Sequence, residues 1–116
     1  MPFIALEFSI PKNTPANIPV RQINDLGVNS QRIQSVEIII PDGHKGLPGM
    51  RIEIPGRVII PDTGSSVQWV RGNNTTIKSI VNAIVDGPPY QVTMYGFNLD
   101  AFLSHTFIIN ITTGEN

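Results

Sequence analysis

The sequence contains no cysteine and carries little charge. The missing cysteines exclude disulfide bonds, thiolate sites for zinc or iron–sulfur clusters, and a thiol nucleophile. Charged residues make up 15% of the chain, against about 25% in an ordinary soluble domain. The formal net charge is −1, which argues against a general electrostatic binder of nucleic acid.

Long apolar runs are also missing, so no segment is expected to span a membrane. Residues 1–10 lack a basic region and a small-residue cleavage site, and we therefore expect no secretion signal. Asn, Gln, Ser and Thr account for 30 of the 116 residues. Because charge keeps the surfaces of soluble proteins apart, this composition predicts that much of the surface contacts other protein. The alternative is a monomer kept soluble by Asn and Thr.

Ile, Val and Thr together number 35 of 116 residues, which favours strands. Ten prolines and ten glycines cut the chain into short pieces. We expect strands over residues 3–10, 33–40, 50–54, 58–60, 67–71, 77–85, 90–97 and 103–113, with a weak one within 20–28. A chain of this length holds one core. The pattern predicts a single-domain, all-β, antiparallel two-sheet sandwich that is jelly-roll-like.

One segment fits the pattern of either a helix or a strand. Residues 77–85 fit a helical spacing, but their apolar side chains are β-branched, so we favour a strand with apolar residues on both faces. Its outer face would suit a subunit interface.

Residues 55–56 are expected to form a two-residue hairpin turn, across which Ile52 should face Ile59.

The two C-terminal strands carry further expectations. Gly96 should mark a β-bulge. The last strand alternates cleanly, and its inward residues should be Leu103, His105, Phe107, Ile109 and Ile111.

The N-terminal part differs in character from the rest. After the strand over residues 3–10, three prolines fall within residues 11–19, which indicates an extended segment. We therefore divide the chain into an N-terminal strand or arm, residues 1–19, and a sandwich domain, residues 20–116. Proline lowers the entropy lost on docking, so the arm would reach a neighbouring subunit.

Residues 62–66 read Asp-Thr-Gly-Ser-Ser and resemble the catalytic loop of aspartic proteases. In that family a small β-rich chain can dimerise, and each subunit gives one Asp, here Asp62, to a pair that shares a proton and activates water. Residues 94–99 resemble the family's later motif. However, Pro61 stands where the family has an apolar strand residue, and Gly96 follows too closely for the family's flap. Pro-Asp-Thr-Gly is also a favoured turn, so we expect no catalytic residues and keep the dimeric protease as an alternative.

The two histidines suggest no metal site. His44 lies in a glycine-rich loop, and His105 lies on the apolar face of the last strand as a hydrogen-bonded core residue. Neither has a second His, Glu or Asp at metal-ligand spacing, so we expect no metal and no cofactor.

Aromatic residues offer one binding alternative. Trp69 and Arg71 precede an Asn-rich loop, and Trp69, Tyr90 or Tyr95 could form a platform that stacks on a sugar. A tryptophan in such a place is more often a core or interface anchor. No ligand-binding residue is assigned on this basis.

The chain resembles the small jelly-roll virion proteins of tailed bacteriophages, including the capsid decoration (cement) proteins. The likeness rests on turns and strand ends, namely residues 46–52, 60–61, 69–73, 88–90, 96–98 and 105–106. It implies a homotrimer that binds the major capsid protein or another virion protein, is made in the host cytoplasm and resides in the virion. It implies no catalytic residue, and the charge and the short apolar runs predict neither a nucleic-acid nor a membrane partner. A carbohydrate- or receptor-binding module of a phage tail is the main alternative.

Overall fold

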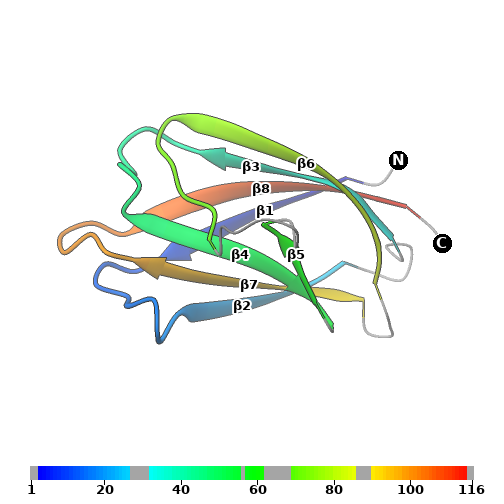
Figure 1. Cartoon of the computed structure of the whole chain (residues 1–116), viewed down its shortest axis with the longest axis horizontal. Helices are drawn as coiled ribbons and strands as arrows, with labels where there is room; N and C mark the ends of the chain where they lie inside the picture. The colour runs from blue at the N-terminus through cyan, green and yellow to red at the C-terminus, as the bar shows by residue number, and fades with distance from the viewer. Residues whose placement is uncertain (1–2, 27–31, 56, 62–68, 86–89, 115–116) are drawn as a thin grey trace.

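The computed structural model describes residues 3–26, 32–55, 57–61, 69–85 and 90–114 (Figure 1). Its strands are β1 (Phe3–Ile10), β2 (Val20–Asp25), β3 (Arg32–Ile40), β4 (Pro48–Ile54), β5 (Arg57–Ile60), β6 (Thr75–Ile84), β7 (Gln91–Asn98) and β8 (His105–Gly114). Within these ranges, no helix is long and apolar enough to cross a membrane.

The strands form two four-stranded sheets, in the orders β1-β8-β3-β6 and β2-β7-β4-β5. Strand 1 pairs with 8, 2 with 7, 3 with 6 and 4 with 5, all antiparallel. Successive pairs alternate between the two sheets. An antiparallel ribbon folded over in this way is a jelly roll. The predicted all-β, two-sheet sandwich is confirmed.

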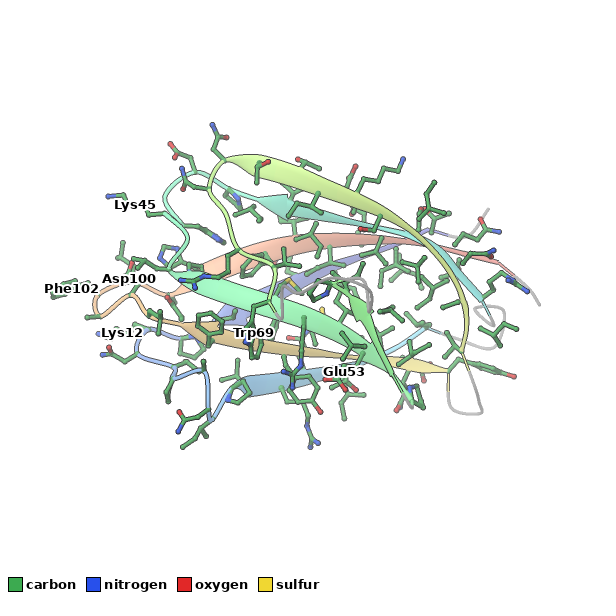
Figure 2. The ribbon with its side chains drawn as sticks, in the orientation of Figure 1. Lys12, Lys45, Glu53, Trp69, Asp100 and Phe102 are labelled. Carbon is green, nitrogen blue, oxygen red and sulfur yellow. The ribbon has the colours of Figure 1, made fainter. Side chains whose placement is uncertain are left out.

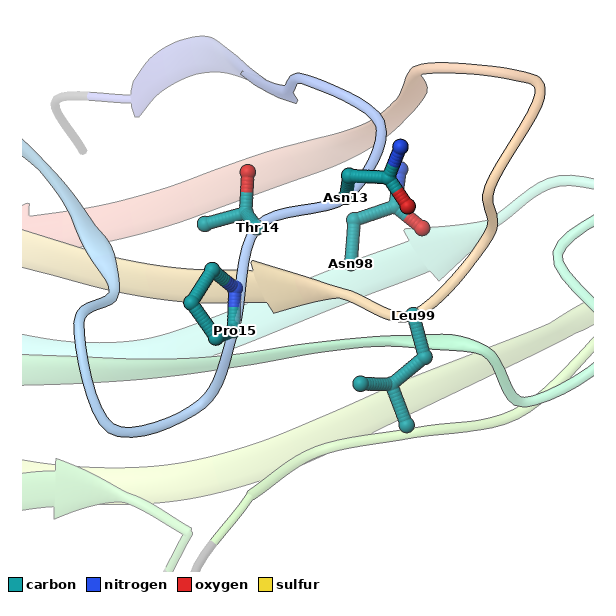
Figure 3. Close-up of a pocket in the computed structure, with 5 residues that line it drawn as sticks. All are labelled: Asn13, Thr14, Pro15, Asn98 and Leu99. Atoms are coloured by element: carbon teal, nitrogen blue, oxygen red, sulfur yellow. The ribbon is translucent and has the colours of Figure 1, made fainter.

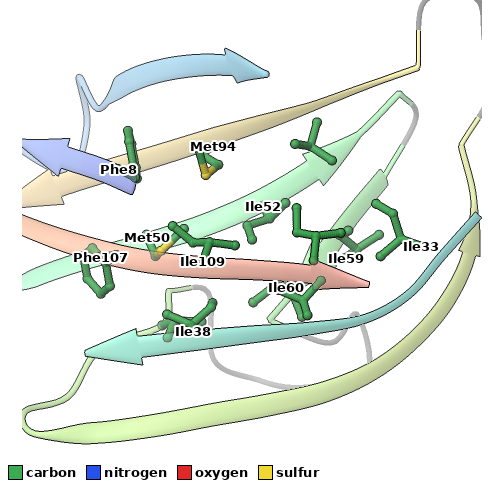
Figure 4. Packing of buried hydrophobic residues seen from close by; sticks show 14 of the residues in the cluster. Phe8, Ile33, Ile38, Met50, Ile52, Ile59, Ile60, Met94, Phe107 and Ile109 are labelled. Atoms are coloured by element: carbon green, nitrogen blue, oxygen red, sulfur yellow. The ribbon is translucent and has the colours of Figure 1, made fainter. Parts of the chain in front are cut away.

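One apolar core fills the space between the sheets (Figure 4). Inward and outward residues alternate along most of β3, β7 and β8, as a half-buried strand requires, and β3 changes phase at the register shift between Ile33 and Ser35. The largest fully buried side chains of this core are Phe8, Phe107, Ile10, Ile33, Ile38, Ile40, Met50, Ile52, Met94, Ile109 and Ile111, whereas Phe97 is buried on the outer face of the second sheet against Trp69. Burial of each such side chain is worth about 1.5–3 kcal/mol, so the isoleucine-rich composition supplies the core.

Gly96 serves close packing. It pairs with Val20 on one side and Met50 on the other, and the register continues through it unchanged. The predicted bulge is therefore wrong. A Cβ at this position would lie 2.4 Å from Ile10 Cδ1 and 2.8 Å from Phe8 Cε2. Residue 96 must be small because side chains of β1 rest directly on the backbone of β7.

The β4–β5 hairpin has a register that the sequence did not reveal. Ile54 pairs with Arg57, so two residues lie in the turn as predicted. The register then shifts between Ile52 and Glu53, and Ile52 lies opposite Ile60 instead of Ile59. An irregularity of this kind adds a residue to one strand and is not visible in an apolar pattern.

Two further expectations need correction. Of the strand predicted over residues 67–71, the described part contains only an isolated bridge between Val70 and Met50. Leu103 is 61% exposed, because β8 begins at His105 and Leu103 belongs to the preceding loop. The inward positions of His105 and Phe107 are confirmed.

The N-terminal strand is part of the sandwich. β1 pairs with β8 from Phe3 opposite Thr112 to Ile10 opposite His105. The side chains of Phe8 and Ile10 are fully buried in the common core. Residues 3–10 therefore form an edge strand of the first sheet instead of an arm apart from the domain.

The ambiguous segment around residue 80 is a strand. β6 forms the other edge of the first sheet and pairs with β3. Ala83 faces the core, whereas Ile80 and Ile84 point outward and are 88% and 48% exposed. Apolar residues on both faces are therefore confirmed for this strand.

Candidate functional site

Four connections meet at one end of the sandwich, which we call the loop end (Figure 1). They comprise residues 11–19, 41–47, 71–74 and 99–104. Backbone hydrogen bonds join them, from Asn13 N to Asp100 O (2.9 Å), from Gly46 N to Gly72 O (3.1 Å) and from Leu99 N to Leu47 O (3.1 Å). Loops bonded to one another in this way form one surface.

Asn73 fastens two of these loops together. Its Oδ1 accepts hydrogen bonds from Gly43 N and Lys45 N, both at 2.9 Å, and its Nδ2 donates to Asp42 Oδ1 at 3.0 Å. The side chain thus replaces backbone pairing that an irregular loop lacks. The Asn-rich stretch noted in the sequence has this structural role.

Asn98, at the end of β7, organises the loop of residues 99–104. It is fully buried. Its Nδ2 donates to Ile10 O at 3.2 Å and to Leu103 O at 2.9 Å, and its Oδ1 accepts from Asp100 N at 3.0 Å. Both amide protons are used, which fixes the loop to β1 and to itself.

Asp100 continues this network. Its Oδ1 accepts from Phe102 N (2.9 Å) and Leu103 N (3.2 Å), and its Oδ2 accepts from His105 Nε2 at 2.8 Å. The backbone donor of Phe102, together with His105, holds the pKa of Asp100 below its usual value, because these bonds favour the carboxylate.

The structure brings the two histidines together, which the sequence did not predict. Their ring centroids are 4.8 Å apart, and His44 also packs edge-on against Phe107. His44 Nε2 bonds to Thr106 O at 3.0 Å, while His44 Nδ1 is buried without a partner. Burial lowers the pKa of His44, and a charge on His105 lowers it further, whereas the bond to Thr106 raises it. The two histidines are distant in sequence. They become neighbours because the β3–β4 connection, which carries His44, lies over the start of β8.

Large apolar side chains project from the same loop. Leu99, Phe102 and Leu103 are 52%, 83% and 61% exposed, and we call them the apolar tip. Figure 2 places Phe102 at the extreme of the molecule, at the same end as Lys12 and Lys45. Three such residues on one short, well-bonded loop form an exposed apolar patch, which is a feature of contact surfaces.

An open pocket of about 190 Å³ lies beside the apolar tip (Figure 3). It is lined by Asn13, Thr14, Pro15, Asn98 and Leu99. Thr14 Oγ1 donates to Pro11 O at 2.8 Å, and the Asn98 amide is committed to the loop network. The polar groups around this pocket mostly bond to the protein itself, so they hold the loops in place.

A second cluster lies on the outer face of the β2-β7-β4-β5 sheet. The Arg51 guanidinium lies 4.6 Å from the ring centroid of Trp69 and 4.7 Å from that of Tyr95. Trp69 also meets Phe97 edge-on, with the centroids 5.0 Å apart. Tyr90 does not join this cluster and packs against the core instead. Arg51 therefore occupies the space between the two aromatic rings that were candidates for sugar stacking.

Asp62 and the rest of its motif lie outside the described residues. In the part of the chain that the structure describes, no three His, Cys, Asp or Glu side chains are grouped to hold a metal ion. Comparison with known proteins finds no matching family model and no matching curated protein.

Proposed function

We propose that this chain is a structural virion protein, of the capsid decoration (cement) or minor capsid kind, that stabilises a phage particle through protein–protein contacts. The apolar tip carries the proposal. Phe102 is 83% exposed, although a side chain of this size gains about 1.5–3 kcal/mol when it is buried. A partner with a matching apolar pocket would supply that burial.

The order of the loop strengthens the argument. Asn98 and Asp100 together hold the backbone of residues 100, 102 and 103. A loop that is already ordered loses little conformational entropy when it docks. The tip is therefore presented as a fixed anchor.

The partner we propose is the major capsid protein or another virion protein, reached by a homotrimer of this chain. The low charge of the chain suits extended contacts, because burying unpaired charge is costly. Ile80 and Ile84, exposed on the edge strand β6, offer a surface for contact between copies that is separate from the loop end.

The test has two stages. Particles from a lysate of the host that carries the gene are banded by density, washed and examined by mass spectrometry for this chain. Particles lacking the chain are then mixed with purified wild type, Phe102→Ser or the control Ile23→Ser, which changes a 50% exposed residue of β2. Binding by wild type and the control, with loss for Phe102→Ser, supports the proposal. Absence of the chain from washed particles would overturn it.

The carbohydrate-binding alternative has weaker support. Its proposed platform includes Trp69 and Tyr95, but each ring has a face against Arg51, and Tyr90 lies apart. The dimeric protease alternative depends on Asp62, outside the described residues. Its second motif includes Gly96 and Asn98, for which packing and loop bonding give sufficient structural reasons.

A further inference from the structure

We propose that His44 and His105 form an acid-triggered latch that holds residues 41–47 against β8 at neutral pH and releases them when His44 takes up a second proton. This inference does not depend on the virion function. It rests on two buried imidazoles whose centroids are 4.8 Å apart, one of them bonded to a carboxylate and the other lacking a partner at Nδ1.

The hydrogen bonds determine which of the two imidazole rings has a counter-ion for a positive charge. Thr106 O is an acceptor only, so His44 Nε2 carries the proton and Nδ1 bears a lone pair. Asp100 Oδ2 lies 2.8 Å from His105 Nε2, so a positive charge on His105 has a counter-ion. A proton on His44 Nδ1 would instead create a buried N–H without an acceptor, next to a like charge.

The surroundings offer His44 no other counter-ion among the described residues. On its own loop, Asp42 bonds to Gly43 N and Asn73, and the side chain of Lys45 is exposed. On the neighbouring loops, the side chains of Lys12 and Arg71 are exposed and add positive charge to this end. Asp100 is the nearby carboxylate, and it is already bonded to His105.

The loop of residues 41–47 is the part that should move. The ring of His44 is held by a single hydrogen bond to Thr106 O and by its edge contact with Phe107. A second proton on His44 would leave a buried Nδ1–H without an acceptor and would break both contacts, and the hydrogen bond from Leu99 N to Leu47 O would then be lost. None of these changes involves Asp100, so its bond to His105 and the backbone bonds that it accepts from Phe102 and Leu103 would persist.

The direction of the pH effect follows from burial. The pKa of His44 is lowered in the closed state, and it returns toward its usual value of 6.5 when the loop opens. The closed state is therefore favoured above that value and loses its advantage as the pH falls below it.

The test is amide hydrogen exchange measured by NMR on the purified chain between about pH 7 and about pH 4.5, with correction for the intrinsic rates. Protection at Gly46, Leu47 and Leu99 should fall by up to about tenfold per pH unit below pH 6.5, where His44 binds a proton in the opened loop but not in the closed one. Hydrogen-exchange protection at the core residue Ile109 should not fall over the same pH range. If all amides lose protection together, the event is global unfolding and the latch is wrong.

Three variants complete the test. His44→Gln keeps an N–H donor for Thr106 O but does not titrate, and His44→Phe preserves a ring against Phe107. Either folded variant should keep its protection at Gly46 and Leu47 independent of pH. Glu7→Gln, an exposed residue on β1, should behave as the wild type. Equal loss of protection in wild type and His44→Gln, or no loss in wild type, would overturn the latch.

Discussion

The Cβ position of Gly96 lies 2.4 Å from Cδ1 of Ile10, across the gap between the two sheets. Real Cβ atoms essentially never come so close to a neighbour, so Gly96→Ala must push Ile10 and Phe8 out of position. We expect the free energy of unfolding to fall by about 1–3 kcal/mol, the usual cost of overpacking a core. Urea denaturation followed by circular dichroism measures this change.

Gly72→Ala is a matched comparison for this prediction. Its Cβ would lie 3.1 Å from Thr75 Cγ2 and 3.3 Å from Ile40 Cδ1, so only a small adjustment is needed. We expect a clearly smaller loss than at residue 96. Equal stability of Gly96→Ala and the wild type would show that the sheets are less closely packed than described.

Asn98 should be the most sensitive polar residue of the loop end. Asn98→Leu removes the partners of Ile10 O, Leu103 O and Asp100 N, and a group that stays buried and unsatisfied, as Ile10 O would, costs about 1–3 kcal/mol. We expect a loss of stability of at least about 2 kcal/mol in urea denaturation. Asn110→Ala, which loses a single bond to Glu37, should cost about 1 kcal/mol or less. A loss at Asn98 no greater than that at Asn110 would contradict the role assigned to Asn98.

Much of the fold could be predicted because its signals are local. Alternation along the last strand placed Phe107 and Ile109 inside, and the residues that flank the turn at 55–56 pair as expected. Features set by distant neighbours were missed. Residue 96 has to be small because Ile10 of the other sheet packs against it. A glycine within a strand can mark either a β-bulge or a close approach of this kind, and the sequence does not distinguish the two.

The candidate site was harder to predict. His44 and His105 looked unrelated because they are far apart in sequence, and only the order of strands in the sheets joins their loops. Leu103 looked like part of the last strand because it continues the alternation, but Asn98 and Asp100 bend the backbone into a loop before His105. Polar side chains that bond to backbone leave no periodic pattern to read.

Asp100 should make the loop end sensitive to strong acid. Its pKa is lowered in the folded chain, chiefly by the bonds from Phe102 N and His105. The stability that it contributes is therefore present above its usual pKa of 3.8 and is lost as the pH falls below that value. Thermal melts from about pH 5 to about pH 2.5 should show a steeper decline for wild type than for Asp100→Asn. Parallel declines would show that Asp100 does not couple protonation to folding.

Arg51 should control the environment of the single tryptophan. Its guanidinium lies between the rings of Trp69 and Tyr95, and such contacts are worth about 0.5–1 kcal/mol at exposed sites. Arg51→Ala should shift the fluorescence of Trp69 to longer wavelength and lower the stability by about 1 kcal/mol. Lys78→Ala, on the other sheet, should change neither. An unshifted spectrum would mean that the environment of Trp69 does not depend on its contact with Arg51.

Ile80 tests the proposed trimer separately from the apolar tip. Its side chain is 88% exposed on β6, so Ile80→Lys should change the free energy of unfolding by less than about 0.5 kcal/mol. A charge buried between copies, by contrast, would oppose association strongly. Native mass spectrometry should show a trimer for the wild type and for Phe102→Ser, and a monomer for Ile80→Lys. A monomeric wild type would contradict self-association in solution. A trimeric Ile80→Lys would place the contact between copies away from the outer face of β6.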